Sequence, residues 1–165
     1  MHLLIVEADY YKDLQAELIN GATQVIEAEG ATFDIVSVPG ALEIPGAVAM
    51  AAMSDKYDGY VALGVVIRGE TTHYDTVCNE SARGLMDLTI NEKLCIGNGI
   101  QTVENSEQAW ARARVSDKNK GGGAAAAALH LIALARKWGA QSKGVGFKPA
   151  TGEYQLAGKT GFTTT

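Results

Sequence analysis

The stretch YVALGVVIRGETTHYD, residues 60–75, decides the fold class of this chain. Its first half is a continuous apolar run, which is typical of a strand buried on both faces of a parallel sheet. Its second half passes through Gly69 and two threonines into a segment for which we expect a helix over about 73–88. A buried strand that leads directly into a helix is the unit from which parallel α/β sheets are built.

The same alternation continues on both sides of this unit. Apolar runs predict further strands over 2–6, 33–38 and 94–100. Helical spacing and end signals predict helices over 13–29, 45–53 and 106–114, and an alanine-rich helix that follows a polar joint at 116–123 and ends near 138. Strands that alternate with helices in this way predict a three-layer α/β/α sandwich around a four-stranded parallel sheet.

The pattern changes after Gly139, where glycines become frequent and no helical period continues. We therefore divide the chain into a core, residues 1–140, and a C-terminal extension, residues 141–165. The extension is either a flexible tail or an added edge strand, because EYQLA (153–157) alternates polar and apolar residues.

Composition excludes several classes of function. The chain has 165 residues and a net charge of −5, so it lacks the basic balance that nucleic-acid binding favours. No apolar run reaches the ~18 residues of a membrane span, and the first residues lack the basic start of a signal peptide. We therefore expect a cytoplasmic protein with no nucleic-acid or membrane partner.

Short motifs argue against a metal or a nucleotide cofactor. Cys78 and Cys95 are too few and too far apart for a disulfide framework or a redox pair, so we expect buried, reduced thiols. The histidines have no metal-ligand spacing. The run GGGAAAAA (121–128) lacks the GK[ST] of a P-loop, and no GxGxxG follows a strand. That run is typical of a helix start onto which a neighbouring helix or subunit packs closely.

The carboxyl ends of the predicted strands carry the candidate site, because ligands of parallel α/β sheets bind there. After the third strand, Gly69 permits a close backbone approach, Thr71 and Thr72 offer hydroxyls, and the following helix presents the positive end of its dipole. This combination predicts an anion site, with His73 beside it for proton exchange. The structural alternative is that the threonines only cap the helix and the histidine only packs.

The helix over 106–114 offers a cation for that anion. Arg112 and Arg114, in AWARAR, could donate a guanidinium to a phosphate or could lie on a solvated helix face. The other strand ends also carry polar residues and glycines: Tyr10 and Tyr11 after the first strand, PGALEIP (39–45) after the second, and GNG (97–99) at the fourth.

In their order and separations, these strand ends resemble the 6,7-dimethyl-8-ribityllumazine synthase family. The matching pieces are VPGALEIP (38–45), ALGVVIRGETTHYD (62–75), NESARGLMDL (79–88) and SEQAWARAR with NKGG (106–122). IRGxTxH after a buried strand, joined to PGxxEIP upstream, is a specific combination. The resemblance implies a flavodoxin-like topology and a cofactor-free enzyme of riboflavin biosynthesis.

The reaction that the resemblance implies is a condensation. The amine of 5-amino-6-(D-ribitylamino)uracil attacks the ketone of 3,4-dihydroxy-2-butanone 4-phosphate, and loss of phosphate, loss of water and ring closure give the lumazine. This chemistry needs proton transfer and an anion clamp but no metal or redox group.

Site residues carry over from the resemblance position by position. His73 matches the proton-transfer histidine of the family. The residues expected at the ribityl chain and the pyrimidine are Tyr10, Ala41, Leu42, Glu43, Val65, Val66, Ile67 and Asn98, and those expected at the phosphate are Glu70, Thr71, Arg112 and Lys120.

The chain departs from the family pattern at three places. Asp9-Tyr10 stands where the family has an aromatic preceded by a basic residue, so the stacking ring is kept while the charge beside it differs. Asn98 replaces an aromatic residue. The strand that precedes the first core strand of the family is missing, and additional sequence lies at the C-terminal end instead.

The resemblance also implies an oligomer. The family forms pentamers, dimers of pentamers or sixty-subunit shells, with active sites at subunit interfaces. VSDKNK (115–120) lacks the GxKxGN kink of shell formers, so we expect a homopentamer, with a decamer or a 60-mer as alternatives. We expect part of residues 147–165 to replace the missing strand at a sheet edge. Two alternatives to an enzyme stay open: a catalytically silent or engineered assembly scaffold on this fold, and a flavin- or lumazine-binding module.

Overall fold

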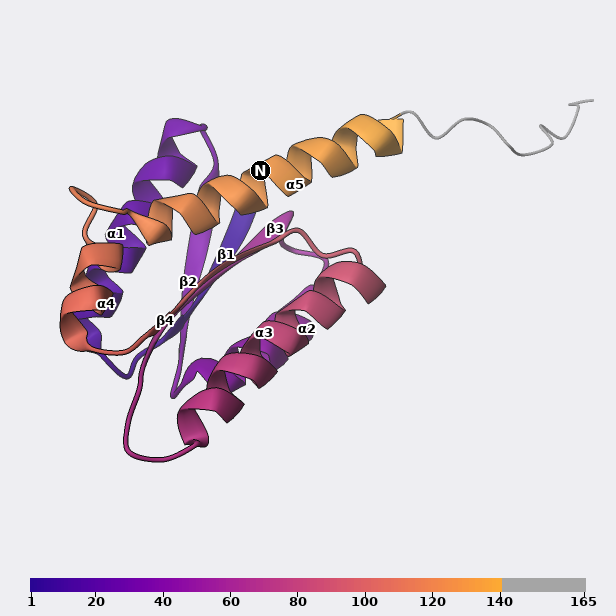
Figure 1. The fold of residues 1–165 in the computed structure, drawn as a ribbon. Coiled ribbons are helices and arrows are strands. Elements are labelled where there is room, and N and C mark those ends of the chain that lie inside the picture. Colours follow the sequence, from indigo (N-terminus) through magenta and orange to yellow (C-terminus); the bar gives the residue numbers. More distant parts are fainter. Residues whose placement is uncertain (141–165) are drawn as a thin grey trace, which may run out of the picture.

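The computed structural model describes residues 1–140, so the predictions for the extension, residues 141–165, lie outside the described part of the chain (Figure 1). The strands are β1 (His2–Ala8), β2 (Thr32–Val38), β3 (Gly59–Ile67) and β4 (Ile96–Val103). The helices are α1 (Lys12–Ala28), the short 3-10 turn η1 (Ala41–Glu43), α2 (Ile44–Ala52), α3 (His73–Asn91), α4 (Ser106–Ala113) and α5 (Lys120–Ala140).

The strands form one parallel sheet in the order β2-β1-β3-β4. Helices α1, α4 and α5 cover one face of the sheet, and α2 and α3 cover the other (Figure 1). The predicted three-layer α/β/α sandwich with a four-stranded parallel sheet is confirmed. β2 pairs with one edge of β1, and β3 pairs with the other edge. The strand order therefore reverses at β1, as it does in flavodoxin-like folds.

The central strands are buried on both faces, as their continuous apolar runs predict. In β1, Leu3 and Ile5 belong to the core under α1 and α5, whereas Leu4 and Val6 belong to the core under α2 and α3. Alternate side chains of a strand point to opposite faces, so one short run of sequence supplies both cores. No helix within residues 1–140 is long and apolar enough to cross a membrane.

Two glycines let α5 lie unusually close to its neighbours. A Cβ atom on Gly97 of β4 would collide with the backbone carbonyl oxygen of Ala124 in α5. A Cβ atom on Gly121 of α5 would collide with the backbone carbonyl oxygen of Leu18 in α1. The glycine and alanine run at the start of α5 therefore serves close packing within the subunit, in agreement with the interpretation from sequence.

Two predicted boundaries were wrong. The fourth strand does not stop near residue 100 but continues to Val103, because residues 100–103 keep pairing with 64–67 of the long strand β3. Asn98 consequently lies within β4, opposite Ala62, and not at a strand end. The last helix begins at Lys120 and not after the glycines, because the Asn119 side chain accepts a hydrogen bond from the Gly122 N–H (3.1 Å) and so caps the helix.

Candidate active site

A cavity of about 540 Å³ opens at the carboxyl ends of β1, β2 and β3. It lies beside β1, where the strand order reverses, which is the position at which ligands bind in open α/β sheets. The lining residues come from the three strand ends, η1 and the first turns of α3: Ala8, Tyr10, Tyr11, Pro39, Gly40, Ala41, Leu42, Glu43, Val65, Val66, Ile67, Gly69, Thr71, His73, Tyr74 and Val77.

Two tyrosines follow β1 at the mouth of the cavity. The Tyr10 side chain is 71% exposed, and its ring meets the ring of Tyr11 edge to face, with the centroids 4.9 Å apart. Burial raises the pKa of Tyr11, and the neighbouring Tyr10 adds to this effect. One aromatic face of Tyr10 is thus available to a planar ligand, as stacking on a heterocycle requires.

The segment after β2 forms the second side of the cavity. The chain turns at Pro39 and Gly40 into η1, where the Glu43 N–H donates to the Gly40 carbonyl oxygen (3.2 Å). Ala41 is buried and anchors the turn to the sheet, while Leu42 and Glu43 are exposed. This turn presents backbone groups and one carboxylate to the cavity, which suits a ligand rich in hydroxyl groups.

The end of β3 and the start of α3 form the third side. Val65, Val66 and Ile67 provide an apolar wall that ends at Gly69. Within residues 1–140 the Thr72 hydroxyl makes no capping hydrogen bond to α3, and the Thr71 hydroxyl accepts a long one from the His73 N–H (3.4 Å). The threonine pair is therefore not a simple side-chain cap, and the start of α3, with the positive end of its dipole, borders the cavity.

Most of the residues predicted for the site meet in this cavity. Those that line it are Tyr10, Ala41, Leu42, Glu43, Val65, Val66, Ile67, Thr71 and His73. An aromatic ring, the turn at 41–43, and the apolar wall with its hydroxyl and histidine therefore converge in one place, although they come from three separate stretches of sequence.

Four predicted residues do not line the cavity of their own subunit. Glu70 is exposed in the loop before α3. Asn98 is exposed on β4, and its Oδ1 accepts from the Ile100 N–H (3.0 Å). Arg112 lies on α4, where its Nη1 donates to the Gln108 carbonyl oxygen (3.1 Å), and Lys120 is exposed at the start of α5. Their roles at a ligand stay predictions.

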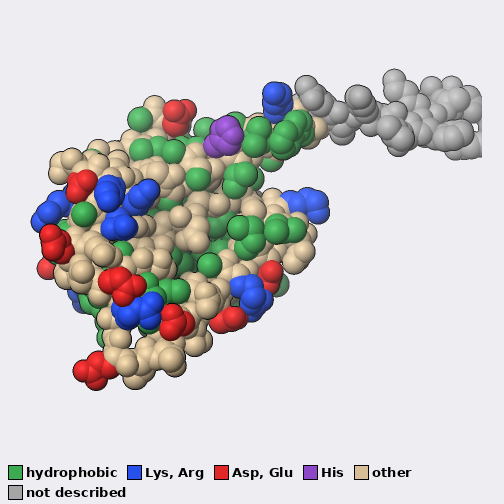
Figure 2. Space-filling model, viewed as in Figure 1, with side chains coloured by type: hydrophobic (Ala, Val, Ile, Leu, Met, Phe, Trp, Pro, Cys, Tyr) green, Lys and Arg blue, Asp and Glu red, His purple; other side chains and the backbone are tan. Residues whose placement is uncertain are grey.

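The cavity therefore has no cation of its own among the residues that line it within 1–140. Basic side chains gather instead where α4 leads into α5 (Figure 2). This basic segment consists of Arg112, Arg114, Lys118 and Lys120. The cavity and the basic segment thus lie on different parts of one subunit.

Sequence reasoning missed some lining residues, among them Tyr74 and Val77. Tyr74 and Val77 follow His73 by one and four positions, and residues four apart share a helix face, so helical spacing could have indicated Val77. Burial raises the pKa of Tyr74. Tyr11, which the sequence analysis placed with Tyr10 after the first strand, also lines the cavity.

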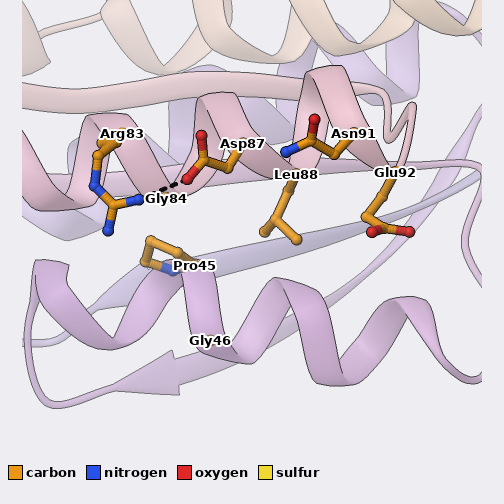
Figure 3. A pocket seen from close by; sticks show the side chains of 8 residues that line it. All are labelled: Pro45, Gly46, Arg83, Gly84, Asp87, Leu88, Asn91 and Glu92. Carbon is orange, nitrogen blue, oxygen red and sulfur yellow. Dashed lines mark hydrogen bonds and ion pairs between the residues drawn. The ribbon is translucent and has the colours of Figure 1, made fainter.

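A second, shallower hollow of about 330 Å³ lies between α2 and α3 (Figure 3). Within it the Arg83 guanidinium pairs with the Asp87 carboxylate (2.6 Å), and Arg83 also pairs with Glu80 (2.8 Å). Gly84 lies against Pro45 where the two helices approach each other. None of the predicted site residues lines this hollow, so the cavity at the strand ends is the candidate active site. Residues 1–140 hold no group of three or more His, Cys, Asp or Glu side chains arranged for a metal ion.

Comparison with known proteins identifies the family of this chain. The profile of the family described as 6,7-dimethyl-8-ribityllumazine synthase matches residues 1–136. The chain belongs to the 6,7-dimethyl-8-ribityllumazine synthase family. The resemblance predicted from the strand-end motifs is thereby confirmed, and with it the prediction of a transferase of riboflavin biosynthesis.

Individual members of this lumazine synthase family are close in sequence. The protein named 6,7-dimethyl-8-ribityllumazine synthase of Agrobacterium fabrum is 62% identical over 143 residues, covering 84% of this chain and 97% of its own. That of Bartonella henselae is 59% identical over 141 residues, covering 84% and 91%. The protein named 6,7-dimethyl-8-ribityllumazine synthase 1 of Rhizobium meliloti is 58% identical over 146 residues, covering 86% and 95%.

Proposed function

We propose that this chain condenses 5-amino-6-(D-ribitylamino)uracil with 3,4-dihydroxy-2-butanone 4-phosphate in the cavity at the strand ends, releasing phosphate and water and forming 6,7-dimethyl-8-ribityllumazine. The observation that carries the proposal is the convergence of an apolar wall, an exposed aromatic ring, a histidine and a helix N-terminus in one cavity of a family member. Family membership does not favour the alternatives of a silent scaffold or a flavin-binding module.

The pyrimidine is proposed to lie between Tyr10 and the wall formed by Val65, Val66 and Ile67. A flat heterocycle gains from stacking on an exposed tyrosine and from burial against aliphatic side chains. The ribityl chain would extend along Ala41, Leu42 and Glu43, where the exposed Glu43 carboxylate can accept hydrogen bonds from its hydroxyl groups. Tyr10 and η1 therefore determine the orientation of the first substrate.

The phosphate of the second substrate is proposed to bind at the start of α3. The positive end of the helix dipole and the backbone N–H groups of the first turn favour an anion there. The Thr71 hydroxyl would donate to a phosphate oxygen, and Gly69 and Glu70 would contribute through backbone rather than through the Glu70 carboxylate, which repels an anion.

His73 is proposed to transfer the protons of the reaction. When the amine attacks the ketone, a proton must leave nitrogen and another must reach the carbinol oxygen before water departs as the imine forms. Elimination of phosphate then requires removal of a proton from carbon. A histidine that borders both the apolar wall and the helix start can serve these steps near neutral pH. Holding the two substrates together in one cavity supplies much of the remaining rate enhancement.

The site is proposed to be completed by a second copy of the chain. The phosphate half-site lacks a lysine or an arginine within the described residues of its own subunit, whereas Arg112 and Lys120 lie in the basic segment. Asn98 is exposed on the edge strand β4, where a neighbouring copy can reach it. We infer a homopentamer first, with a decamer or a 60-mer as alternatives, and we infer a cytoplasmic enzyme.

The direct test is to mix the two substrates with the purified protein and to follow the absorbance and fluorescence of the lumazine. Turnover that depends on both substrates supports the proposal. Tight flavin binding without turnover would support the binding module instead, and neither activity would support a scaffold. The mass of the native particle in solution, measured on the same preparation, separates the three oligomers.

A further inference from the structure

The loop that joins β3 to α3 is poorly supported by packing, although the phosphate site depends on it. Residues 69–73 are all exposed, so no buried side chain anchors them. The hydrogen bonds around the loop run from the Arg68 N–H to the Val103 carbonyl oxygen (2.9 Å) at its start and from the His73 N–H to the Thr71 hydroxyl (3.4 Å) within it. At its end, the N–H groups of Asp75 and Thr76 donate to the Thr72 carbonyl oxygen (3.0 and 3.4 Å). Something else must hold Thr71 and His73 in place.

The Arg68 side chain connects the three elements that surround this loop. Its Nε donates to Oε2 of Glu104, just after β4, at 2.7 Å. Its Nη1 lies 3.4 Å from Oδ1 of Asp75 in the first turn of α3. The guanidinium carbon lies 4.0 Å from the centre of the Tyr74 ring, and Tyr74 lines the cavity. One side chain thus joins the ends of two strands to the start of the helix.

This arrangement suits arginine and no other residue. A guanidinium is a planar fork that can donate in two directions while its face stacks on an aromatic ring, whereas an ammonium group is a single point charge. The two carboxylates compensate the charge of Arg68 and hold its pKa above the usual range. Arg68 does not line the cavity, so it is not placed to bind the phosphate itself.

We infer that Arg68 is a positioning residue: it acts through Glu104, Asp75 and Tyr74 to hold Thr71 and His73 in the geometry that binds the phosphate substrate. The inference rests on the proposed function, because it concerns the same site. It is specific to the second substrate, since Tyr10, η1 and the wall of β3 do not depend on the loop. A small displacement of the loop should therefore weaken phosphate-substrate binding and slow the proton transfers.

The test compares steady-state kinetics of Arg68→Gln, Arg68→Lys and Glu104→Ala with those of the wild type. For Arg68→Gln we expect KM for the butanone phosphate to rise and kcat to fall, each roughly tenfold, while KM for the pyrimidine changes by less than about twofold. Arg68→Lys should behave like Arg68→Gln, because lysine keeps the charge but loses the fork. If lysine restored the wild-type KM, a long-range charge effect would explain the data and the inference would be wrong.

Glu104→Ala distinguishes a positioning role of Arg68 from a simple charge effect, because the two explanations predict opposite changes in KM for the butanone phosphate. If only charge mattered, removal of a negative charge near the phosphate should tighten binding of the phosphate substrate. Loss of the contact between Arg68 and Glu104 should instead weaken that binding, because the loop is then held less firmly. We expect KM for the butanone phosphate to rise. A fall in KM, or no change, would overturn the inference.

Arg83→Gln is the matched control, because Arg83 is an exposed arginine that also pairs with two carboxylates but lies away from the cavity. It should leave both KM values unchanged. Thermal unfolding of every variant shows whether the fold is retained. If the wild type turns over normally and the Arg68 variants match it, only this inference fails; if the wild type does not turn over, the proposed function fails.

Discussion

His73 and Arg112 provide a decisive test of the proposal that two copies of the chain share each active site, because the two residues belong to different parts of the molecule. His73 lines the cavity, whereas Arg112 lies on α4 outside it and is held by the Gln108 carbonyl oxygen. If a second copy supplies Arg112, each complete pocket takes its histidine from one subunit and its arginine from a neighbour. Variants that lack one of the two residues should then restore each other in mixed oligomers.

The single variants set the baseline for this test. His73→Ala removes a general acid–base group, which costs about 10²–10⁴-fold in turnover. Arg112→Ala removes charge-assisted hydrogen bonds worth about 1.5–3 kcal/mol, so kcat/KM for the butanone phosphate should fall roughly tenfold to hundredfold. Both variants are expected to assemble, because His73 is exposed and the Arg112 side chain is only partly buried.

The expected recovery follows from counting pockets. When the two variants are expressed in equal amounts, a pocket is complete when its histidine comes from an Arg112→Ala subunit and its arginine from an His73→Ala subunit. With random assortment, about one half times one half, or about a quarter, of the pockets are complete. The fraction is the same for any closed ring of identical interfaces.

The assay co-expresses the two variants with different tags, purifies oligomers that carry both, and measures lumazine formation at low butanone phosphate. We expect about a quarter of the wild-type rate per pocket. Wild-type chains carrying the same two tags provide the reference, and a simple mixture of separately purified variants provides the background. Activity no higher than that background would refute a site shared between copies and would leave Arg112 without its proposed role.

Further predictions concern the fold. Gly121→Ala should lower the free energy of unfolding by about 1–3 kcal/mol, because the added Cβ meets the Leu18 carbonyl oxygen. Gly123→Ala, which has open space around it, should leave that free energy unchanged or raise it. Chemical denaturation measures both variants, and equal effects would contradict the packing argument. Hydrogen bonds, chiefly from Lys56 and then Tyr57, lower the pKa of Asp34 to about 2, so Asp34 stabilises the fold above its unfolded pKa, and this stabilisation is lost as the pH falls toward about 2. Asp34→Asn should therefore lower the thermal midpoint at pH ~6 but much less at pH ~2.5, and a pH-independent difference would contradict this. Truncation after Ala140 should lower the thermal midpoint if residues of the extension pair with the partly exposed edge strand β2, and an unchanged midpoint and oligomer would refute that pairing.

The fold was predictable because its signals are local. The run over 60–67 is apolar at nearly every position, which only a strand covered on both faces requires, and β3 is accordingly buried along most of its length. The predicted end of the fourth strand failed because Gly97 and Gly99 look like a turn in sequence. In the fold they are places where α5 and β3 approach β4 closely, so the partner of each glycine decides its meaning.

The candidate site was predictable to the extent that its residues follow strand ends. Thr71 and His73 come directly after β3 and lie in the cavity, as expected. Tyr74 was missed because its place at the cavity depends on the contact with Arg68, which no periodicity indicates. Asn98, Arg112 and Lys120 were assigned through the resemblance alone, and they lie outside the cavity of their own subunit.

By itself the amino-acid sequence determined the layers, the family and the chemical types at the strand ends, because hydrophobic periodicity and short motifs act over a few residues. Only the tertiary structure decided which of those residues share a cavity. It also decided that no lysine or arginine within residues 1–140 of the same subunit lines the cavity, and that the Arg68 side chain connects the β3–α3 loop to the end of β4. These properties depend on contacts between residues far apart in the chain, such as Arg68 and Glu104, and such contacts exist only after the sheet has brought the strand ends together.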